Sequence, residues 1–298
     1  MTQATTDQDW LAQRFEAHRA HLRRVAYRML GSLTEADDAV QEAWIRLSRT
    51  DTSEVENLRA WLTTVVGRVC LNQLRARRAR PEAPLDAHVA DPIVGPASGN
   101  DPEHEALLGD SVGLALLAVL ETLTPAERVA FVLHDVFALS FDEIAPIVGR
   151  SSAAARQLAS RGRRRVQGAP VPDTDLDGQW AVVDAFLAAS RDGDFERLLA
   201  VLDPDVVLRS DGGAARPGLD TVLHGAQAVG RGAMSFRRVA ETATRAVVNG
   251  VPGGVAWTQD GRPFAVVSLT VVRGRIVSID ILADPDRLAR LDLDLLGR

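Results

Sequence analysis

Residues Ser140 to Val166 constrain the fold most, because they carry the signals of two short helices joined by a tight turn. Ser140-Phe-Asp-Glu143 has the pattern of a capping box. Gly149 permits a tight turn, after which Ser151 or Ser152 can cap a second helix. At about 100° per residue, the second helix collects its apolar residues on one side and its polar residues on the other. A helix pair of this kind can place that polar side in the major groove of DNA.

The polar side of the second helix carries residue types that bind DNA. Arg and Gln can form paired hydrogen bonds with base edges, whereas Ser and further Arg suit phosphates. The alternative is an ordinary solvated helical hairpin, in which arginine only keeps the surface wet. The candidate DNA-binding residues of this helix are Ser152, Arg156, Gln157, Ser160, Arg161, Arg163 and Arg164.

Basic charge is concentrated in two segments of an otherwise acidic chain. The net charge is −6, and the 34 basic residues are all arginine. Six arginines and no Asp or Glu lie between Arg59 and Arg80, and the same is true between Arg150 and Gly168. Because each phosphate contact releases a counterion, two local basic faces favour a nucleic-acid partner despite the net negative charge.

The 298 residues are enough for about two domains, and their texture divides them into three folded segments and two linkers. Apolar residues at helical spacing predict all-helical segments at 10–80 and 105–168. The proline-rich stretch 81–104 between them is expected to be a mobile linker. After a second linker at 169–176, residues 177–298 have two helices followed by β-rich segments. This order predicts an α+β domain, with helices packed on a curved sheet of antiparallel strands.

Two helices of the first segment complement the helix pair. The helix from Leu58 to about Arg78 can bind single-stranded or melted DNA through phosphate contacts and stacking, although core packing explains Trp61 equally well. Its candidate DNA-binding residues are Arg59, Trp61, Arg68, Asn72, Arg75, Arg77 and Arg78. The preceding helix, expected to be capped by Thr34 and to reach Trp44, is acidic and suits a basic protein partner.

In combination, these motifs resemble those of bacterial extracytoplasmic-function (ECF) sigma factors, group IV of the sigma-70 family. The similar sequences, in the family's order over residues 10–168, are Asp37-Asp-Ala-Val-Gln-Glu-Ala-Trp-Ile-Arg-Leu47, Trp61-Leu62 with the arginine cluster, Leu123-Thr-Pro-Ala-Glu-Arg128 and the helix pair. The resemblance implies two all-helical domains, sigma region 2 and sigma region 4, and two partners, core RNA polymerase and promoter DNA.

The resemblance also assigns roles to particular residues. Asp37, Asp38, Gln41 and Glu42 would bind the clamp helices of the largest polymerase subunit. The chain around 48–57 and the helix up to Arg80 would capture the melted minus-ten element, and Ser152–Arg165 would read the minus-thirty-five element. Many members have Asn at the position of Arg68 and Asp at that of Asn72, and here Arg68 could serve a phosphate.

The C-terminal segment resembles the SnoaL-like branch of the nuclear-transport-factor-two fold, a cone-shaped α+β domain that extends a subgroup of these sigma factors. The resemblance implies regulation of the sigma regions in cis, in place of a separate anti-sigma protein. The residues expected to form the regulatory contact between domains are Asp211, Gly212, Gly213, Asn249, Gly250, Pro252, Gly253, Asp284, Pro285 and Asp286. The subgroup's usual motif is Asp-Gly-Gly-Gly-Lys, whereas here Asp211-Gly212-Gly213 is followed by Ala214-Ala215-Arg216. The subgroup's Trp-Leu-Pro motif is missing from the proline-rich linker.

A second class of function stays open from the sequence. The protein could be a DNA-binding regulator whose C-terminal domain is a small-molecule sensor or a cyclase- or isomerase-like enzyme. Candidate acids and bases for such a site are Asp211, His224, Asp260 and Asp280. Their spacing in the sequence does not identify an acid–base pair. Asp211 precedes two glycines, a pattern that is more typical of a turn.

Several sites and locations are disfavoured by composition. The single cysteine, Cys70, excludes an internal disulfide and a cysteine-based zinc site, and the six histidines are scattered. We therefore expect no catalytic residue, metal or cofactor, and at most a small ligand in the C-terminal domain. The polar first residues and the lack of an apolar run of about 18 residues predict a cytoplasmic protein that does not bind membranes.

Overall fold

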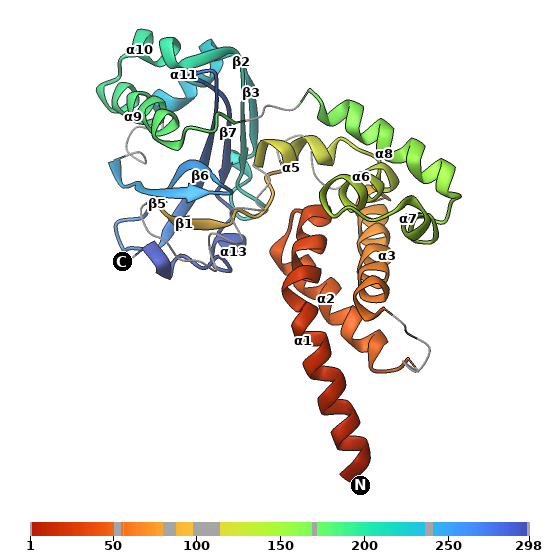
Figure 1. The fold of residues 1–298 in the computed structure, drawn as a ribbon. Coiled ribbons are helices and arrows are strands. Elements are labelled where there is room, and N and C mark those ends of the chain that lie inside the picture. The colour runs from red at the N-terminus through yellow and green to blue at the C-terminus, as the bar shows by residue number, and fades with distance from the viewer. Residues whose placement is uncertain are drawn as a thin grey trace. The chain divides into compact units, whose positions relative to one another are not determined.

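The computed structural model describes residues 2–50, 55, 57–79, 88–97, 114–168, 172–235 and 241–296. The chain forms two compact units, each built from two stretches of sequence (Figure 1). The first unit contains Met1–Ala83 and Val119–Gly168, and the second contains Pro84–Ala118 and Ala169–Arg298. Residues 88–97, the described part of the proline-rich segment, thus belong to the C-terminal unit.

The first unit begins with three helices around one apolar core. They are α1 (Thr2–Leu30), α2 (Leu33–Leu47) and α3 (Leu58–Ala79). Leu22 and Met29 of α1 and Leu62 of α3 are fully buried. The expected cap at Thr34 is wrong, because the Ser32 hydroxyl accepts the Glu35 N–H at 3.4 Å and α2 begins at Leu33. Ser32 follows Gly31, whose φ of +70° ends α1 and turns the chain.

The second part of this unit contains the predicted helix pair. Its elements are α6 (Pro125–Phe131), a π-helical turn η2 (Val132–Val136), α7 (Phe141–Val148) and α8 (Ser152–Val166). Helix α5 (Leu114–Glu121) precedes them, and the boundary between the two units falls within it, after Ala118. Both predicted capping boxes are present, with Thr124 paired to Glu127 and Ser140 paired to Glu143. Gly149 ends α7 with a φ of +67°, and Ser151 caps α8. The predicted pair of helices joined at a glycine is confirmed.

Within the first unit, α3 packs against the helices that follow the linker. A Cβ atom at Gly67 would lie 3.1 Å from Ile147 Cγ2, so glycine allows the close approach of α3 and α7. Arg68 Nη2 donates to the Pro146 carbonyl at 3.2 Å. Arg128 of α6 is 3% exposed, and burial, with Arg77 nearby, lowers its pKa to about 10. Its Nε and Nη2 atoms have no hydrogen-bond partner among the residues that the structure describes.

The second unit is an α+β domain, as expected. Helices α9 (Leu176–Asp192), α10 (Phe195–Val201) and α11 (Ala226–Ser235) lie together on a seven-stranded sheet (Figure 1). The strands are β1 (Val94–Pro96), β2 (Leu202–Asp211), β3 (Thr221–His224), β4 (Thr244–Val248), β5 (Val251–Trp257), β6 (Pro263–Val272) and β7 (Arg275–Leu282). Their spatial order is β1-β4-β5-β6-β7-β2-β3. Short helical turns η3 (Pro217–Leu219), α13 (Pro285–Leu288) and η4 (Asp294–Leu296) complete the unit.

The core of the α+β domain lies between its helices and one face of β2, β6 and β7. It includes Val183, Phe186, Leu198, Leu208 and Ile279, all buried. The predicted hairpin at Val271–Arg275 is confirmed by positive φ angles at Arg273 and Gly274 between β6 and β7. The sheet is mixed rather than antiparallel throughout, because β2 pairs with β7 in parallel.

The segment 88–97 is an ordered part of the C-terminal sheet rather than a mobile linker. Its strand β1 pairs with β4 in antiparallel register, with Val94 opposite Val248 and Pro96 opposite Ala246. Val89 and Val94 are buried. This is a correction to the expected boundary, and its cause is non-local: the hydrogen-bonding partner of this short strand lies about 150 residues further along the chain.

Candidate functional site

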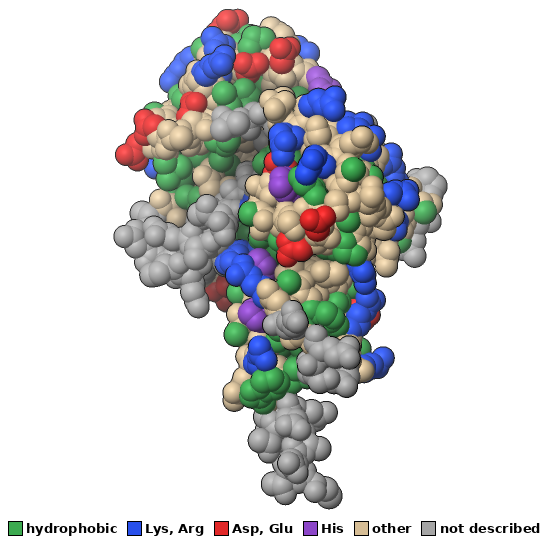
Figure 2. Space-filling model, turned by 45° about the vertical axis from the view of Figure 1, so that its right-hand side comes forward, with side chains coloured by type: hydrophobic (Ala, Val, Ile, Leu, Met, Phe, Trp, Pro, Cys, Tyr) green, Lys and Arg blue, Asp and Glu red, His purple; other side chains and the backbone are tan. Residues whose placement is uncertain are grey.

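The polar side of α8 is exposed as predicted. Ala155, Leu158, Ala159 and Gly162 are buried against the unit, and a Cβ atom at Gly162 would lie 2.9 Å from Phe131 Cβ. The candidate residues Arg156, Gln157, Arg161, Arg163 and Arg164 are exposed, whereas Ser152 and Ser160 are half-buried. Figure 2 shows arginine side chains distributed over this side of the molecule, with few acidic side chains among them.

Neighbouring elements hold some of the α8 arginines. Arg161 Nε lies 3.1 Å from Glu127 Oε1, and Arg163 Nε donates to Asp135 Oδ1 at 2.7 Å. Arg165, which was not among the candidates, donates to Glu127 Oε2 at 2.9 Å. By contrast, Gln157 and Arg164 make no side-chain hydrogen bond or ion pair to a described residue. The candidate set therefore divides into residues tied to the scaffold and residues free to bind a ligand.

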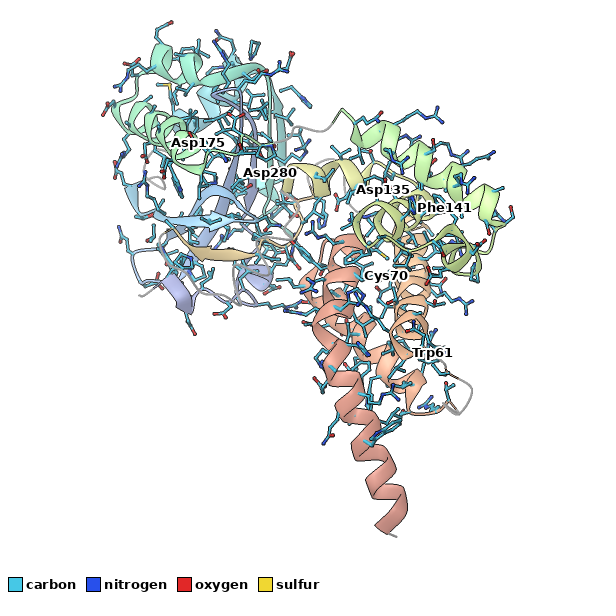
Figure 3. All side chains as sticks on the ribbon, in the orientation of Figure 1. Trp61, Cys70, Asp135, Phe141, Asp175 and Asp280 are labelled. Atoms are coloured by element: carbon cyan, nitrogen blue, oxygen red, sulfur yellow. The ribbon has the colours of Figure 1, made fainter. Side chains whose placement is uncertain are left out.

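The first turn of α8 is tied to the first turn of α7. Ser152 Oγ donates to Asp142 Oδ1 at 2.5 Å. The Arg156 guanidinium lies over the Phe141 ring, 5.2 Å from its centre, and the centres of the Phe141 and His134 rings are 4.0 Å apart. Phe141 and Asp135 are labelled in Figure 3. The start of the exposed helix is thus held by two residues of α7, one of which, Phe141, is itself stacked on His134 of η2.

Glu127 is the buried acid at the base of α8. Burial raises the pKa of its carboxyl, but the hydrogen bonds with Thr124 and the charges of Arg165 and Arg161 outweigh burial and lower it. The side chain is 6% exposed, whereas the two arginines are about half exposed. Glu127 therefore serves both as the capping residue of α6 and as an anchor for α8.

The candidate residues on α3 fall into two groups. Arg59, Arg68, Asn72, Arg75 and Arg78 are exposed, and Trp61 is half-buried (Figure 3). Arg77 is turned inward, where it pairs with Glu35 and donates to the Leu30 carbonyl at 2.9 Å. Arg77 therefore uses donors within the unit in this structure, and its contact with DNA stays a prediction. Arg80 and residues 51–54 and 56 of the expected minus-ten segment lie outside the described residues.

Two of the exposed α3 arginines line a shallow cavity of about 380 Å³. Arg75 and Arg78 form one side, and the first residues of α6 form the other, Thr124 to Ala126. Arg59 Nη2 lies 3.4 Å from His21 Nδ1. Burial, together with Arg59 and Arg24, lowers the pKa of His21 to about 4. The basic charge of α3 is thus directed to the surface of the unit.

The acidic helix α2 presents its candidate polymerase-binding residues on the outside. Asp37, Asp38 and Gln41 are exposed, and Glu42 is half-buried. Asp37 Oδ1 accepts from Arg23 Nε at 2.7 Å, and Glu42 Oε1 accepts from Arg46 Nε at 2.8 Å. Asp38 and Gln41 make no side-chain contact of this kind with a described residue. They are the members of the set that are free for a basic partner.

The predicted regulatory residues of the C-terminal unit bind the segment 88–97. Asp211 Oδ2 accepts from the Val89 N–H at 3.1 Å, and Asn249 Oδ1 accepts from the Ile93 N–H at 2.6 Å. Arg287 completes the site by donating to Asp211 Oδ2 at 2.7 Å, to Asp91 Oδ1 at 2.7 Å and to the Val89 carbonyl at 2.5 Å. We call this set of contacts the linker site.

The other predicted residues of the linker site shape its backbone. Asp284 caps α13 and accepts from the Arg287 N–H at 3.3 Å, which places Arg287. Gly213 has a φ of +62°, and a Cβ atom there would collide with the Asp284 carboxylate. Asn249 and Gly250, both with positive φ, form the β4–β5 turn. The remaining members are Gly212, Pro252 and Gly253 near these turns, and Pro285 and Asp286 in α13.

Sequence reasoning missed the partners on the linker and the cation that joins them. Val89, Asp91 and Ile93 lay in a stretch without periodicity, so no pattern marked them. Arg287 stands one residue beyond the predicted set, in the same Asp-Pro-Asp-Arg-Leu sequence. An arginine next to the two acidic residues of this turn was the available signal for a buried ion pair.

The charge of Asp211 is stabilised by the linker. Burial raises the pKa of its carboxyl, but His88, the Val89 N–H and the charge of Arg287 outweigh burial and lower it to about 2. The side chains of Asp211 and Arg287 are 12% and 18% exposed. A charged hydrogen-bonded pair with so little solvent is costly to break by removing one partner.

The remaining candidate acids and bases do not meet at one place. Asp280 is buried on β7, where it accepts from Arg209 Nη1 at 3.1 Å and from Ser278 Oγ at 2.8 Å, and burial raises its pKa. His224 is exposed at the end of β3, and Asp260 is exposed and pairs with Arg262. Among the described residues, no group of three or more His, Cys, Asp or Glu could hold a metal ion. Nor does that part of the chain contain a helix with the length and hydropathy of a membrane span.

Comparison with known proteins bears on this arrangement. The family model "Sigma-70 region 2" matches residues 14–80, and "Sigma-70, region 4" matches residues 113–166. The chain is 38% identical over 297 residues to the probable ECF RNA polymerase sigma factor SigI of Mycobacterium tuberculosis, covering 97% of this chain and 98% of that protein. It is 36% identical over 289 residues to the ECF sigma factor SigJ of the same organism, covering 92% and 91%.

A solved structure shares the whole architecture. The crystal structure of M. tuberculosis SigJ aligns with a TM-score of 0.75 at 33% identity, covering 95% of this chain and 99% of that one. The match spans both helical parts and the C-terminal α+β domain, so the expected fold class is confirmed. The chain belongs to the extracytoplasmic-function RNA polymerase sigma factors.

Proposed function

We propose that this sigma factor directs core RNA polymerase to specific promoters through the exposed faces of α2, α3 and α8, and that its C-terminal domain regulates it in cis through the linker site. It would act in the cytoplasm, where polymerase and DNA are. The observation that carries the regulatory part is the position of residues 88–97. They connect the two helical parts of the first unit, yet they pair with β4 of the second.

The linker site supplies a physical route for this regulation. The connecting segment is bound by two side chains that accept from its backbone, Asp211 and Asn249, and by the buried cation Arg287. Holding the segment restricts the chain that joins region 2 to region 4. Release of the segment removes this restraint on the chain between the two regions, which then stay together only through their own contacts, such as that of Arg68 with Pro146. Occupancy of the linker site would in this way act on the sigma regions without a separate protein.

Truncation and point substitution test the regulation together. Transcription with core polymerase would be compared for the full chain, for a chain ending at Gly168, and for Arg287→Ala. Because both changes release the linker, they are expected to alter promoter-specific transcription in the same direction. Unchanged transcription after truncation, or opposite effects of truncation and Arg287→Ala, would refute cis-regulation through this site.

Polymerase binding is proposed for the free acidic residues of α2. Asp38→Arg is expected to weaken holoenzyme formation by at least tenfold, since it places a cation where a basic partner binds. Asp205→Arg, an equal charge change at an exposed position of β2, is the matched control. Equal affinities of the two variants for core polymerase would contradict the assignment.

We propose no chemical step for the C-terminal domain. The side chains that suit catalysis are already used in contacts: Asp211 binds the linker, and Asp280 is held by Arg209 and Ser278. Ligand sensing by this domain is the second candidate, and the buried Asp280–Arg209 pair is the observation that favours it. A small molecule that binds in place of one partner of this pair would shift the unfolding midpoint of the wild-type protein and not that of the Asp280→Asn variant.

A further inference from the structure

Three side chains from three elements form a stack at the start of α8. The rings of His134 in η2 and Phe141 in α7 are 4.0 Å apart at an interplanar angle of 30°. The guanidinium of Arg156 in α8 lies over the Phe141 ring, 5.2 Å from its centre. His134 is itself anchored, because its Nδ1 lies 2.9 Å from the Leu139 carbonyl. Figure 3 labels Phe141 at this point of the helical unit.

The stack restrains Arg156 without using up its hydrogen-bond donors. A guanidinium attracted to the face of an aromatic ring keeps its N–H groups, which lie in its own plane, available at the edge. Arg156 is exposed, and its side chain accordingly faces solvent beyond the ring. A free arginine loses much rotamer entropy when it binds a base, and a restrained one loses less.

A second contact fixes the helix from which Arg156 projects. Ser152 Oγ donates to Asp142 Oδ1 at 2.5 Å, so the first two residues of α7 both contact the first turns of α8. Asp142 directly follows Phe141 in the sequence. The backbone and the side-chain end of Arg156 are therefore both positioned from the beginning of α7.

We propose that Phe141 is a specificity-determining positioning residue: its ring orients Arg156 toward one base pair of the minus-thirty-five element. The proposal rests on the proposed role of α8 in reading that element. Phe141 acts through Arg156 and needs no DNA contact of its own. Its influence is confined to the base pair that Arg156 reads, whereas a residue that only supports the fold affects every position equally.

The test uses holoenzyme assembled from the full chain and a promoter library randomised over the minus-thirty-five element. Arg156→Ala identifies the base position that Arg156 reads. Phe141→Leu, which keeps an apolar side chain but removes the ring face, is expected to reduce discrimination at that position by about two- to fivefold. Phe141→Tyr restores the ring and should restore discrimination. Phe264→Leu removes another Arg–Phe contact, with Arg216 in the C-terminal domain, and is the matched control.

Each outcome separates the proposal from its premise. If Arg156→Ala changes selection at no position, the assignment of α8 as the reading helix fails. If Arg156→Ala changes one position and Phe141→Leu leaves it unchanged, the positioning role of Phe141 fails. A uniform loss at all positions with a lowered unfolding midpoint, unrelieved by Phe141→Tyr, would also overturn it, because Phe141 would then only support the fold.

Discussion

Asp211→Asn should release the linker segment from the C-terminal sheet. The amide keeps an acceptor for the Val89 N–H and nearly the same volume, so the change removes mainly the charge that faces Arg287. The pKa of Asp211 falls from 3.8 to about 2 in the folded protein. At about 1.4 kcal/mol for each tenfold change in proton affinity, the charged form is stabilised by about 2 kcal/mol. Loss of that stabilisation raises the population of the opened segment by up to about 30-fold, an upper bound because Arg287 supplies part of it from within the C-terminal unit itself.

Amide hydrogen exchange of the full chain at neutral pH measures this opening directly. The amides of the segment 88–96 other than those of Pro92 and Pro96, and above all the Val89 and Ile93 N–H groups, should exchange up to about 30-fold faster in Asp211→Asn than in the wild type, while the β6–β7 core stays unchanged. Asp260→Asn, in an exposed turn, is the matched control and should leave this segment unaffected. Unchanged exchange at 88–96 in Asp211→Asn would refute the reasoning.

The pH dependence of the linker site has a defined sign. A carboxyl whose pKa is lower in the folded protein stabilises it fully above the unfolded value, 3.8. That stabilisation is lost as the pH falls from about 4 toward 2. Exchange of the wild-type segment, corrected for its intrinsic rate, should therefore approach that of Asp211→Asn at acidic pH.

Two further predictions concern the first unit. Gly162→Ala should lower the stability of the first unit by about 1 kcal/mol, because the cost of crowding Phe131 exceeds the gain in helix propensity. Denaturant unfolding measures this loss of stability, and Gly168→Ala is a neutral control. Glu127→Gln should destabilise the unit by about 1–3 kcal/mol at pH 7, and by much less below its lowered pKa, where the wild-type carboxyl is also neutral. Glu143→Gln, in an exposed capping box without arginine partners, should change stability less, and an equal loss would contradict the role of the arginines.

The helix pair was predictable from sequence because its signals are local. The capping boxes at Thr124 and Ser140 depend on pairs of residues three positions apart. The turn at Gly149 depends on the positive φ angle of that one residue. The polar side of α8 follows from helical spacing alone. The same reasoning misplaced the start of α2, since Ser32 and Thr34 are both good caps and only the φ of Gly31 decides between them.

The linker strand and its site were not predictable in full, because their stability comes from distant parts of the chain. Strand β1 has three residues, and its pairing depends on β4. The parallel pairing of β2 with β7 likewise depends on strands far apart in sequence. Asp211 and Asn249 were found through resemblance, but their immediate role in binding Val89 and Ile93 required the structure. Arg77 shows the opposite limit, because spacing cannot tell a surface arginine from one paired with Glu35.

The place of β1 at the edge of the sheet has a consequence for self-association. While the linker is bound, the outer backbone groups of β4 are covered by a strand from the same chain. Departure of the linker uncovers a row of unpaired N–H and C=O groups, which is a template for a strand of another molecule. The released state therefore has a tendency to aggregate or to pair with a second copy. Light scattering of Arg287→Ala would accordingly rise more steeply with protein concentration than light scattering of the wild type. The contact through which we propose regulation is therefore also the contact that protects the edge of the sheet.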